Sequence, residues 1–205
     1  LKIPDIPKET KILPINSAAV IGCGTMGGGI AMNFANVGIP VTVIENSQDS
    51  LDKGMNIIEK NYSNTVAKGR MTEDDFKNKM SLIKGATNLD SISSTDIVVE
   101  AVFEEMGLKK KMFERIDKIA KKNCILATNT STLDIDQIAE STTRPEYVIG
   151  THFFSPANVM KLLEIVRGKH SSKEVIASTM KLAKTIKKVP VLAGNCDGFI
   201  GNRMF

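Results

Sequence analysis

The chain has little of the chemistry that several protein classes need. Its 205 residues contain no Trp, two Tyr and eight Phe, so aromatic side chains on which nucleic-acid bases could stack are scarce. The 27 Lys and Arg residues stand beside 23 Asp and Glu residues, and the resulting charge of +4 is spread along the chain. This balance is typical of a solvated surface and argues against a nucleic-acid-binding protein. With 42% hydrophobic residues, a chain of this length can bury a core of its own.

Cysteine and histidine are also few. Cys23, Cys124 and Cys196 lie far apart and are odd in number, which predicts reduced thiols in a reducing compartment rather than a disulfide framework. The two histidines are His152 and His170. We therefore expect no metal site.

No apolar run is long enough to span a membrane. Residues 12–44 carry no charge, but six glycines and two prolines interrupt them. The N-terminal residues lack the apolar segment of a signal peptide. Residues 1–16 contain three prolines and mixed charges. They predict a linker that arrives from an upstream segment, followed by one domain over residues 17–205.

Strand-like and helix-like segments alternate along that domain. Apolar strands are expected at residues 18–21, 41–44, 97–99, 124–127, 147–149, 162–166 and 189–192, and helices at 30–35, 50–70, 73–80, 107–121 and 173–187. Such alternation predicts an α/β fold with a doubly wound, mostly parallel sheet that helices cover on both faces. The segments at 50–70 and 73–80 form an inserted helical hairpin in this prediction.

A glycine-rich turn follows the first expected strand and opens the first helix. Its sequence, Gly22-Cys23-Gly24-Thr25-Met26-Gly27, matches the GxGxxG pattern of a Rossmann-type dinucleotide-binding fold. In this pattern Gly22 permits the tight turn, Gly24 lets a pyrophosphate approach the backbone, and Gly27 lets the helix pack on the strand. The phosphates then lie at a helix N-terminus, whose free N–H groups favour negative charge.

Glu45 ends the second expected strand, about 20 residues after the glycines, where an acid accepts hydrogen bonds from the adenine ribose. A carboxylate there repels a 2′-phosphate, and neither Asn46 nor Ser47 supplies a cation to bind one. NAD is therefore favoured over NADP. The alternative is a glycine-rich turn beside a surface glutamate.

A histidine and a glutamate in the second half of the chain suggest acid–base chemistry. His152 lies at the end of an expected strand, where a parallel sheet presents its ligands, and Glu164 interrupts the apolar run of residues 162–166. A carboxylate in a buried strand is costly unless it has a partner. An imidazole held by a carboxylate can accept a proton near neutral pH. On local sequence alone, a histidine at the start of a loop, such as His152, is more often a structural hydrogen-bonding residue, and His170 is expected at the surface.

Several motifs together carry a family resemblance. They are the glycine-rich turn and residues 98–104, 129–131, 152–157, 162–164 and 197–203. Their order and spacing over residues 16–205 resemble the NAD-binding domain of the L-3-hydroxyacyl-CoA dehydrogenases. Segments 152–157 and 194–199 are most similar to the bifunctional peroxisomal branch of that family, in which a hydratase/isomerase region precedes the dehydrogenase.

The resemblance implies NAD-dependent oxidation of a (3S)-3-hydroxyacyl-CoA to the 3-ketoacyl-CoA in fatty acid β-oxidation. It makes His152 the base that takes the proton of the substrate 3-hydroxyl, and Glu164 the group that orients it. Ser131 and Asn202 would bind the substrate oxygens near the reacting carbon. Judged without the family, Ser131 could instead cap the helix that follows it, and Asn202 could cap or orient the final turn.

Further residues are assigned by the same resemblance to the cofactor and to CoA. Glu104 would lie beside the nicotinamide ribose, with Asn129 also at the cofactor, although Glu104 could be a solvated acid. Lys68, near the end of the long helix, would bind CoA phosphates, and a solvated helix face explains that charge almost as well. The lysine run at 109–111 is expected to be a solvated helix face.

The resemblance also implies partners and a compartment. An acyl-CoA thioester is the substrate, an upstream hydratase/isomerase region is expected, and a homodimer could form through a C-terminal helical domain that is absent here. The helical domain would form the second wall of the substrate cleft. Without it, the chain alone is expected to have weak dehydrogenase activity or none. The peroxisome is favoured over the mitochondrion. Two other functions stay open: an NAD-binding, non-catalytic relative of the crystallin or regulatory kind, and a Rossmann dehydrogenase of short hydroxy acids.

Overall fold

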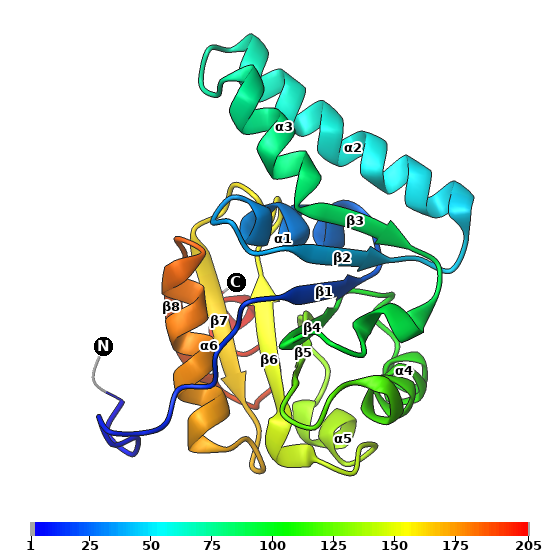
Figure 1. Cartoon of the computed structure of the whole chain (residues 1–205). Helices are drawn as coiled ribbons and strands as arrows, with labels where there is room; N and C mark the ends of the chain where they lie inside the picture. Colours follow the sequence, from blue (N-terminus) through cyan, green and yellow to red (C-terminus); the bar gives the residue numbers. More distant parts are fainter. Residues whose placement is uncertain (1–2, 205) are drawn as a thin grey trace.

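The computed structural model describes residues 3–204, in which one sheet of eight strands runs through the domain in the order β3-β2-β1-β4-β5-β6-β7-β8 (Figure 1). The strands are β1 (Ala18–Ile21), β2 (Val41–Ile44), β3 (Ile83–Ala86), β4 (Ile97–Glu100), β5 (Ile125–Thr128), β6 (Val148–Phe153), β7 (Leu162–Arg167) and β8 (Val189–Gly194). Neighbouring strands are parallel except β6 and β7, which are antiparallel. The expected mostly parallel sheet is therefore confirmed.

Helices cover both faces of the sheet (Figure 1). They are α1 (Thr25–Ala35), α2 (Gln48–Ala67), α3 (Glu73–Ser81), α4 (Met106–Ile119), α5 (Ile135–Ala139) and α6 (Lys173–Thr185), with 3-10 turns at Leu89–Ile92, Pro145–Tyr147 and Asn202–Met204. Phe34 of α1, Tyr62 of α2 and Ile176 of α6 share one apolar core, whereas Phe113 of α4 and Ile138 of α5 lie in the other. Two cores on opposite faces are what a doubly wound sheet requires.

The α2–α3 hairpin extends beyond the β3 edge of the sheet (Figure 1). Its longer helix begins at the N-cap Ser47, whose side chain accepts a hydrogen bond from the Ser50 N–H, and it buries Leu51, Ile58 and Tyr62. Near its start it passes close to the glycine-rich turn, because a Cβ added at Gly54 would lie 2.4 Å from the carbonyl oxygen of Cys23. The inserted hairpin is thus packed against the turn at its base and free of the sheet at its tip.

The β3 strand was not expected from the sequence. In its pattern only Ile83 is buried, Lys84 and Gly85 are exposed, and an edge strand of this kind lacks the continuous apolar run that marks the central strands. Leu51 of α2 occupies the space beside Gly85, where an added Cβ would lie 2.9 Å from the Leu51 Cδ2. The close approach of α2 therefore favours glycine at that point of β3.

The expected linker has no helix or strand over residues 3–16, but it lies against the domain. Leu13 donates its N–H to the Ser178 hydroxyl of α6 at 2.8 Å, and Arg167 forms an ion pair with Asp5 at 2.7 Å. Ile3 and Ile6 are partly buried against the core. Residues 1–2 of the expected linker and residue 205 of the expected domain lie outside the described residues.

The cysteines are free, as expected. Cys23 and Cys124 are buried, and burial raises the pKa of each thiol to about 11, whereas Cys196 is exposed. Within residues 3–204 no cluster of three or more potential metal-ligating acid, histidine or cysteine side chains occurs. Over the same range, none of the helices combines the length and apolarity of a membrane span.

Candidate active site

The glycine-rich turn has the backbone that its sequence predicts. Gly22 has a φ of +97°, which glycine adopts without strain, and a Cβ on Gly27 would lie 1.9 Å from the Gly22 carbonyl oxygen. A Cβ on Gly24 would meet nothing within 4 Å. Gly22 and Gly27 are therefore required by the turn itself. Gly24 instead leaves open space at the N-terminus of α1, which begins at Thr25.

A cavity of about 560 Å³ adjoins this turn at the carboxyl ends of β1, β2 and β4. Gly22, Gly24 and Glu45 line it, together with Arg115 of α4. The Glu45 carboxylate accepts a hydrogen bond from the Cys23 N–H at 2.7 Å, so it lies directly beside the turn. This arrangement brings the predicted ribose-binding acid and the predicted phosphate turn to one site.

His152 and Glu164 are direct partners across the antiparallel β6–β7 pair. The His152 Nδ1 lies 2.6 Å from the Glu164 Oε2, and both side chains are buried. The other carboxylate oxygen, Oε1, accepts hydrogen bonds from the N–H groups of Ile200 and Gly201 at 3.0 and 2.8 Å. Both oxygens of the buried Glu164 are therefore satisfied. Because Glu164 holds the Nδ1 side of the ring, the Nε2 side is left to act on a ligand.

A second cavity, of about 330 Å³, brings the predicted catalytic residues His152 and Ser131 together with residues predicted to bind the cofactor. Its lining includes Met26, Ala101, Val102, Glu104, Asn129, Ser131, His152, Phe153, Phe154 and Ser155. Ala101 and Val102 also line the first cavity, so the two cavities adjoin. The two cavities therefore lie next to each other, one at the glycine-rich turn and the other at His152.

Asn129, Ser131 and Asn202 are fixed by hydrogen bonds to neighbouring segments. The Asn129 Oδ1 accepts from the Phe153 N–H at 2.9 Å, which ties the end of β5 to the end of β6. The Asn202 Nδ2 donates to the Ser131 carbonyl oxygen at 3.0 Å. Helix α5 is capped by Asp134 rather than by Ser131, so the capping interpretation of Ser131 is wrong. Asn202 instead connects the last turn of the described chain to the Ser131 loop.

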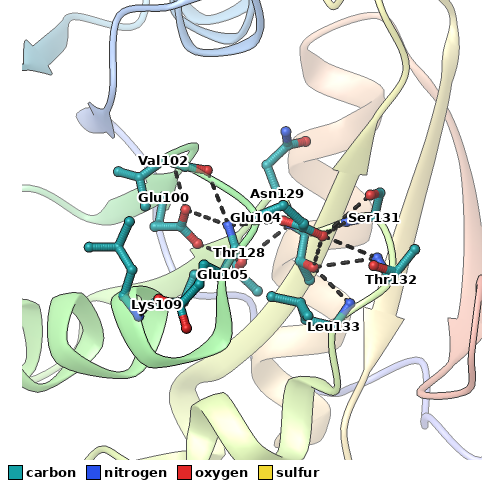
Figure 2. Close-up of polar contacts among 12 residues, drawn as sticks. Glu100, Val102, Glu104, Glu105, Lys109, Thr128, Asn129, Ser131, Thr132 and Leu133 are labelled. Carbon is teal, nitrogen blue, oxygen red and sulfur yellow. Dashed lines mark hydrogen bonds and ion pairs between the residues drawn. The ribbon is translucent and has the colours of Figure 1, made fainter.

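Glu104 holds the loop that carries Ser131 (Figure 2). Its Oε1 accepts hydrogen bonds from the Thr130 hydroxyl, from the Ser131 N–H at 2.8 Å and from the Thr132 N–H at 3.3 Å. Burial alone would raise the pKa of Glu104, but the Thr130 hydroxyl, the Ser131 N–H and the charge of Lys109 outweigh it and lower that pKa. Glu104 is therefore an ionised group with defined partners, and not merely a solvated acid.

Lys109 corrects the expectation of a solvated lysine run. Its side chain is 1% exposed, and its ammonium lies 2.7 Å from the Glu100 Oε1 and 3.3 Å from the Glu104 Oε2. On helix α4 the position of Lys109 faces the end of β4, whereas Lys111 faces solvent. The lysines of the run carry the same charge. Successive residues of a helix point in different directions, however, so Lys109 is buried against the sheet while Lys111 is in solvent.

Lys68 lies apart from these cavities. It is the exposed C-cap of α2, on the hairpin that extends beyond the sheet edge (Figure 1). Its assignment to CoA stays a prediction.

Sequence reasoning missed Glu100 and Thr130. Glu100 is fully buried at the end of the apolar strand β4, and Thr130 is buried in the Ser131 loop. The signal that drew attention to Glu164, a carboxylate in an apolar strand, also marks Glu100 and could have identified it. Thr130 has no comparable signal, since a buried threonine is common in any core.

Comparison with protein families decides the assignment. Residues 17–196 match the family described as 3-hydroxyacyl-CoA dehydrogenase, NAD binding domain. The chain belongs to this family. The predicted NAD-binding, Rossmann-type domain and the family resemblance are thereby confirmed.

Relatives of this NAD-binding domain include multifunctional proteins. The chain is 48% identical to the peroxisomal bifunctional enzyme of Cavia porcellus over 96% of its own length and 27% of that protein. It is 43% identical to a peroxisomal fatty acid beta-oxidation multifunctional protein of Arabidopsis thaliana, over 100% of the chain and 28% of that protein. The chain thus spans little more than a quarter of these curated relatives.

Solved structures of the family share the fold. The (S)-3-hydroxybutyryl-CoA dehydrogenase of Ralstonia eutropha superimposes with a TM-score of 0.91 at 37% identity, over 93% of this chain and 68% of that one. The dehydrogenase part of a multifunctional enzyme of C. elegans gives a TM-score of 0.85 at 34% identity, over 96% of this chain and 46% of that one. In both cases the likeness extends over more than nine-tenths of this chain.

The open face of Gly24 gives a direct test of cofactor binding. We expect Gly24→Val to fold with a loss of only about 1 kcal/mol, because an added Cβ would meet nothing within 4 Å and the remaining cost is that of valine at the N-cap of α1, yet to weaken NADH binding by about 10- to 100-fold by filling the space for the pyrophosphate. NADH fluorescence titration and thermal unfolding measure the two effects. Gly194→Val, where the Cβ also meets nothing within 4 Å, is the matched control. Equal NADH affinity in the two variants would place the pyrophosphate elsewhere.

Proposed function

We propose that the chain supplies the NAD-binding and catalytic half of an enzyme that oxidises (3S)-3-hydroxyacyl-CoA to 3-ketoacyl-CoA in fatty acid β-oxidation. The observation that carries this proposal is the buried His152–Glu164 pair, which opens onto a cavity adjoining the glycine-rich turn. A base beside a dinucleotide site is the arrangement that hydride transfer from an alcohol requires. Family membership is consistent with the same reaction.

The residues present fit NAD. Gly24 leaves its backbone approachable, the first N–H groups of α1 face the same space, and Glu45 lines the cavity at the end of β2. In this proposal Gly22, Thr25, Met26 and Gly27 complete the turn, and Glu104 and Asn129 lie at the nicotinamide end. When bound, NAD supplies the hydride acceptor at the substrate C3.

The protein groups supply orientation and acid–base chemistry. His152 accepts the proton of the substrate 3-hydroxyl at its Nε2, because its Nδ1 is committed to Glu164. Glu164 fixes the ring and stabilises the imidazolium that results. Ser131 and Asn202, which lie on adjoining segments, hydrogen-bond the substrate oxygens and hold C3 in place.

We propose further that the chain works as part of a longer protein, since it spans about a quarter of its curated relatives. In that protein a hydratase/isomerase region precedes it, and a C-terminal helical domain completes the substrate cleft and carries a possible homodimer contact. Lys68 on the hairpin then binds CoA phosphates. The names of the relatives favour a peroxisomal compartment.

Comparing acetoacetyl-CoA with free acetoacetate as oxidants of NADH tests the substrate class. We expect the protein extended through the helical domain to use the thioester at least about 100-fold better in kcat/KM, because the CoA part adds binding energy remote from the reacting carbon. Residues 1–205 alone should show weak turnover or none. Equal use of both oxidants would favour a short hydroxy acid dehydrogenase, and NADH binding without any oxidation would favour a non-catalytic relative.

A further inference from the structure

Lys109 connects a buried carboxylate to the loop that carries Ser131. Its ammonium lies between Glu100, which is completely buried, and Glu104, which is 35% exposed at the edge of the second cavity. Figure 2 shows these three side chains beside the Ser131 loop. A lysine that were only part of a solvated helix face would place its charge in water.

Glu100 provides the fixed end of this connection. Its Oε1 accepts hydrogen bonds from the Lys109 ammonium and from the Val102 N–H, both at 2.7 Å, and its Oε2 accepts from the Thr128 hydroxyl at 2.7 Å. The Glu100, Thr128 and Val102 positions belong to β4, β5 and the segment after β4. Because Glu100 is buried at the end of a central strand and both of its oxygens have hydrogen-bond partners, it can hold a buried ammonium in one place.

Glu104 provides the other end, and its two oxygens divide their contacts. Oε2 faces the Lys109 ammonium at 3.3 Å, whereas Oε1 accepts the hydrogen bonds of Thr130, Ser131 and Thr132. Attraction to Lys109 therefore orients the Glu104 carboxylate, and the hydrogen bonds of that carboxylate hold the Ser131 loop in place. Without the ammonium, a partly exposed glutamate would gain rotamer freedom and lose this direction.

We propose that Lys109 is a positioning residue for the substrate-binding loop: anchored by Glu100, it holds Glu104 so that the loop presents Ser131 toward His152. This role rests on the proposed function of Ser131 at the substrate oxygen. It acts through Glu104 and involves no contact between Lys109 and the substrate. The alternative is an ion pair that stabilises the fold and has no bearing on the loop.

A double-mutant cycle separates these two roles. Replacing Lys109 alone would leave Glu100 as an unpaired buried charge, so the cycle uses a Glu100→Gln background, to which Lys109→Met, Glu104→Ala or both are added. In the extended protein we expect each substitution to raise KM for acetoacetyl-CoA by about 10-fold. The double substitution should raise it no further, with kcat changing by less than about 3-fold. Lys111→Met in the same background is the matched control, because Lys111 lies two residues along α4 and is exposed, and it should match Glu100→Gln alone.

Hydrogen exchange provides a readout that does not depend on turnover. With Lys109→Met added to the Glu100→Gln background, a peptide covering residues 129–133 should exchange at least about 10-fold faster than in Glu100→Gln alone, while peptides from β1 and β6 keep the protection they have in that background. Additive KM effects, unchanged exchange in residues 129–133, or exchange that is faster throughout the domain would each overturn the proposal. If the wild-type protein fails to use the thioester, the proposed function fails, and the exchange comparison still decides whether Lys109 holds the loop.

Discussion

Replacing His152 with glutamine is expected to lower kcat for acetoacetyl-CoA reduction by about 10³-fold, equivalent to about 4 kcal/mol of transition-state stabilisation. The glutamine amide can occupy the space of the ring but cannot exchange a proton near neutral pH. NADH affinity should change by less than about 2-fold, because the glycine-rich turn and Glu45, which are assigned to the pyrophosphate and the adenine ribose, line the first cavity, whereas His152 lines the second. Steady-state kinetics and NADH titration of the extended protein measure both quantities.

Near-normal turnover by His152→Gln would remove His152 from the mechanism. His170 is the matched control, since it is the second histidine of the chain and is exposed. We expect His170→Gln to keep the wild-type kcat, KM and NADH affinity.

Glu164→Gln is expected to lower kcat by about 10²- to 10³-fold with little loss of stability. Its amide oxygen can still accept the N–H groups of Ile200 and Gly201, so the local packing is kept. Its amide NH₂, however, can face the His152 Nδ1, which would then carry no proton and leave the Nε2 protonated. A base in that tautomer cannot accept the substrate proton.

Thermal unfolding and kinetics together test this explanation. A melting temperature within a few degrees of wild type, combined with the loss of kcat, is the expected pair of results, and Glu174→Gln on the exposed face of α6 serves as the control. Combining His152→Gln with Glu164→Gln should cost little more than His152→Gln alone, because both changes disable one unit. Wild-type kcat in Glu164→Gln would show that the pair is structural.

Much of the fold could be predicted because the central strands are buried on both faces. β1, β4 and β5 are continuous apolar runs separated by amphipathic helices, a pattern that few other folds produce. The edge strand β3 escaped prediction because its side chains are largely exposed and only its pairing with β2 defines it. The five-residue helix α5 is shorter than two turns and therefore carries too little periodicity to be recognised.

The His152–Glu164 pair could be suspected from the sequence, but its geometry could not. His152 and Glu164 are twelve positions apart, and they meet because β7 runs antiparallel to β6 with these two residues in direct register. Nothing in the local pattern states the direction of a strand or its register. The cost of burying a carboxylate identified Glu164 and suggested His152 as its partner, and the register of the strands brings the two side chains into contact.

The lysine run shows the opposite limit. Charge alone suggested that Lys109 was solvated, and the structure buries it because Glu100 and Glu104 lie at the same end of β4. Glu100 and Glu104 are visible in the sequence. Their contact with Lys109, however, depends on how α4 packs on the sheet, which the sequence pattern does not give. Composition and periodicity therefore do not predict which side chains of different helices and strands form ion pairs.

NADH formation from (3S)-3-hydroxybutyryl-CoA by the protein extended through the helical domain is the most direct test of the proposed function. We expect saturable NADH formation from the (3S) thioester, which is lost in His152→Gln, and at least about 100-fold less from the (3R) thioester or from free 3-hydroxybutyrate. NADH formation at equal rates from both stereoisomers, or from the free acid, would contradict the proposal. So would retention of the activity in His152→Gln.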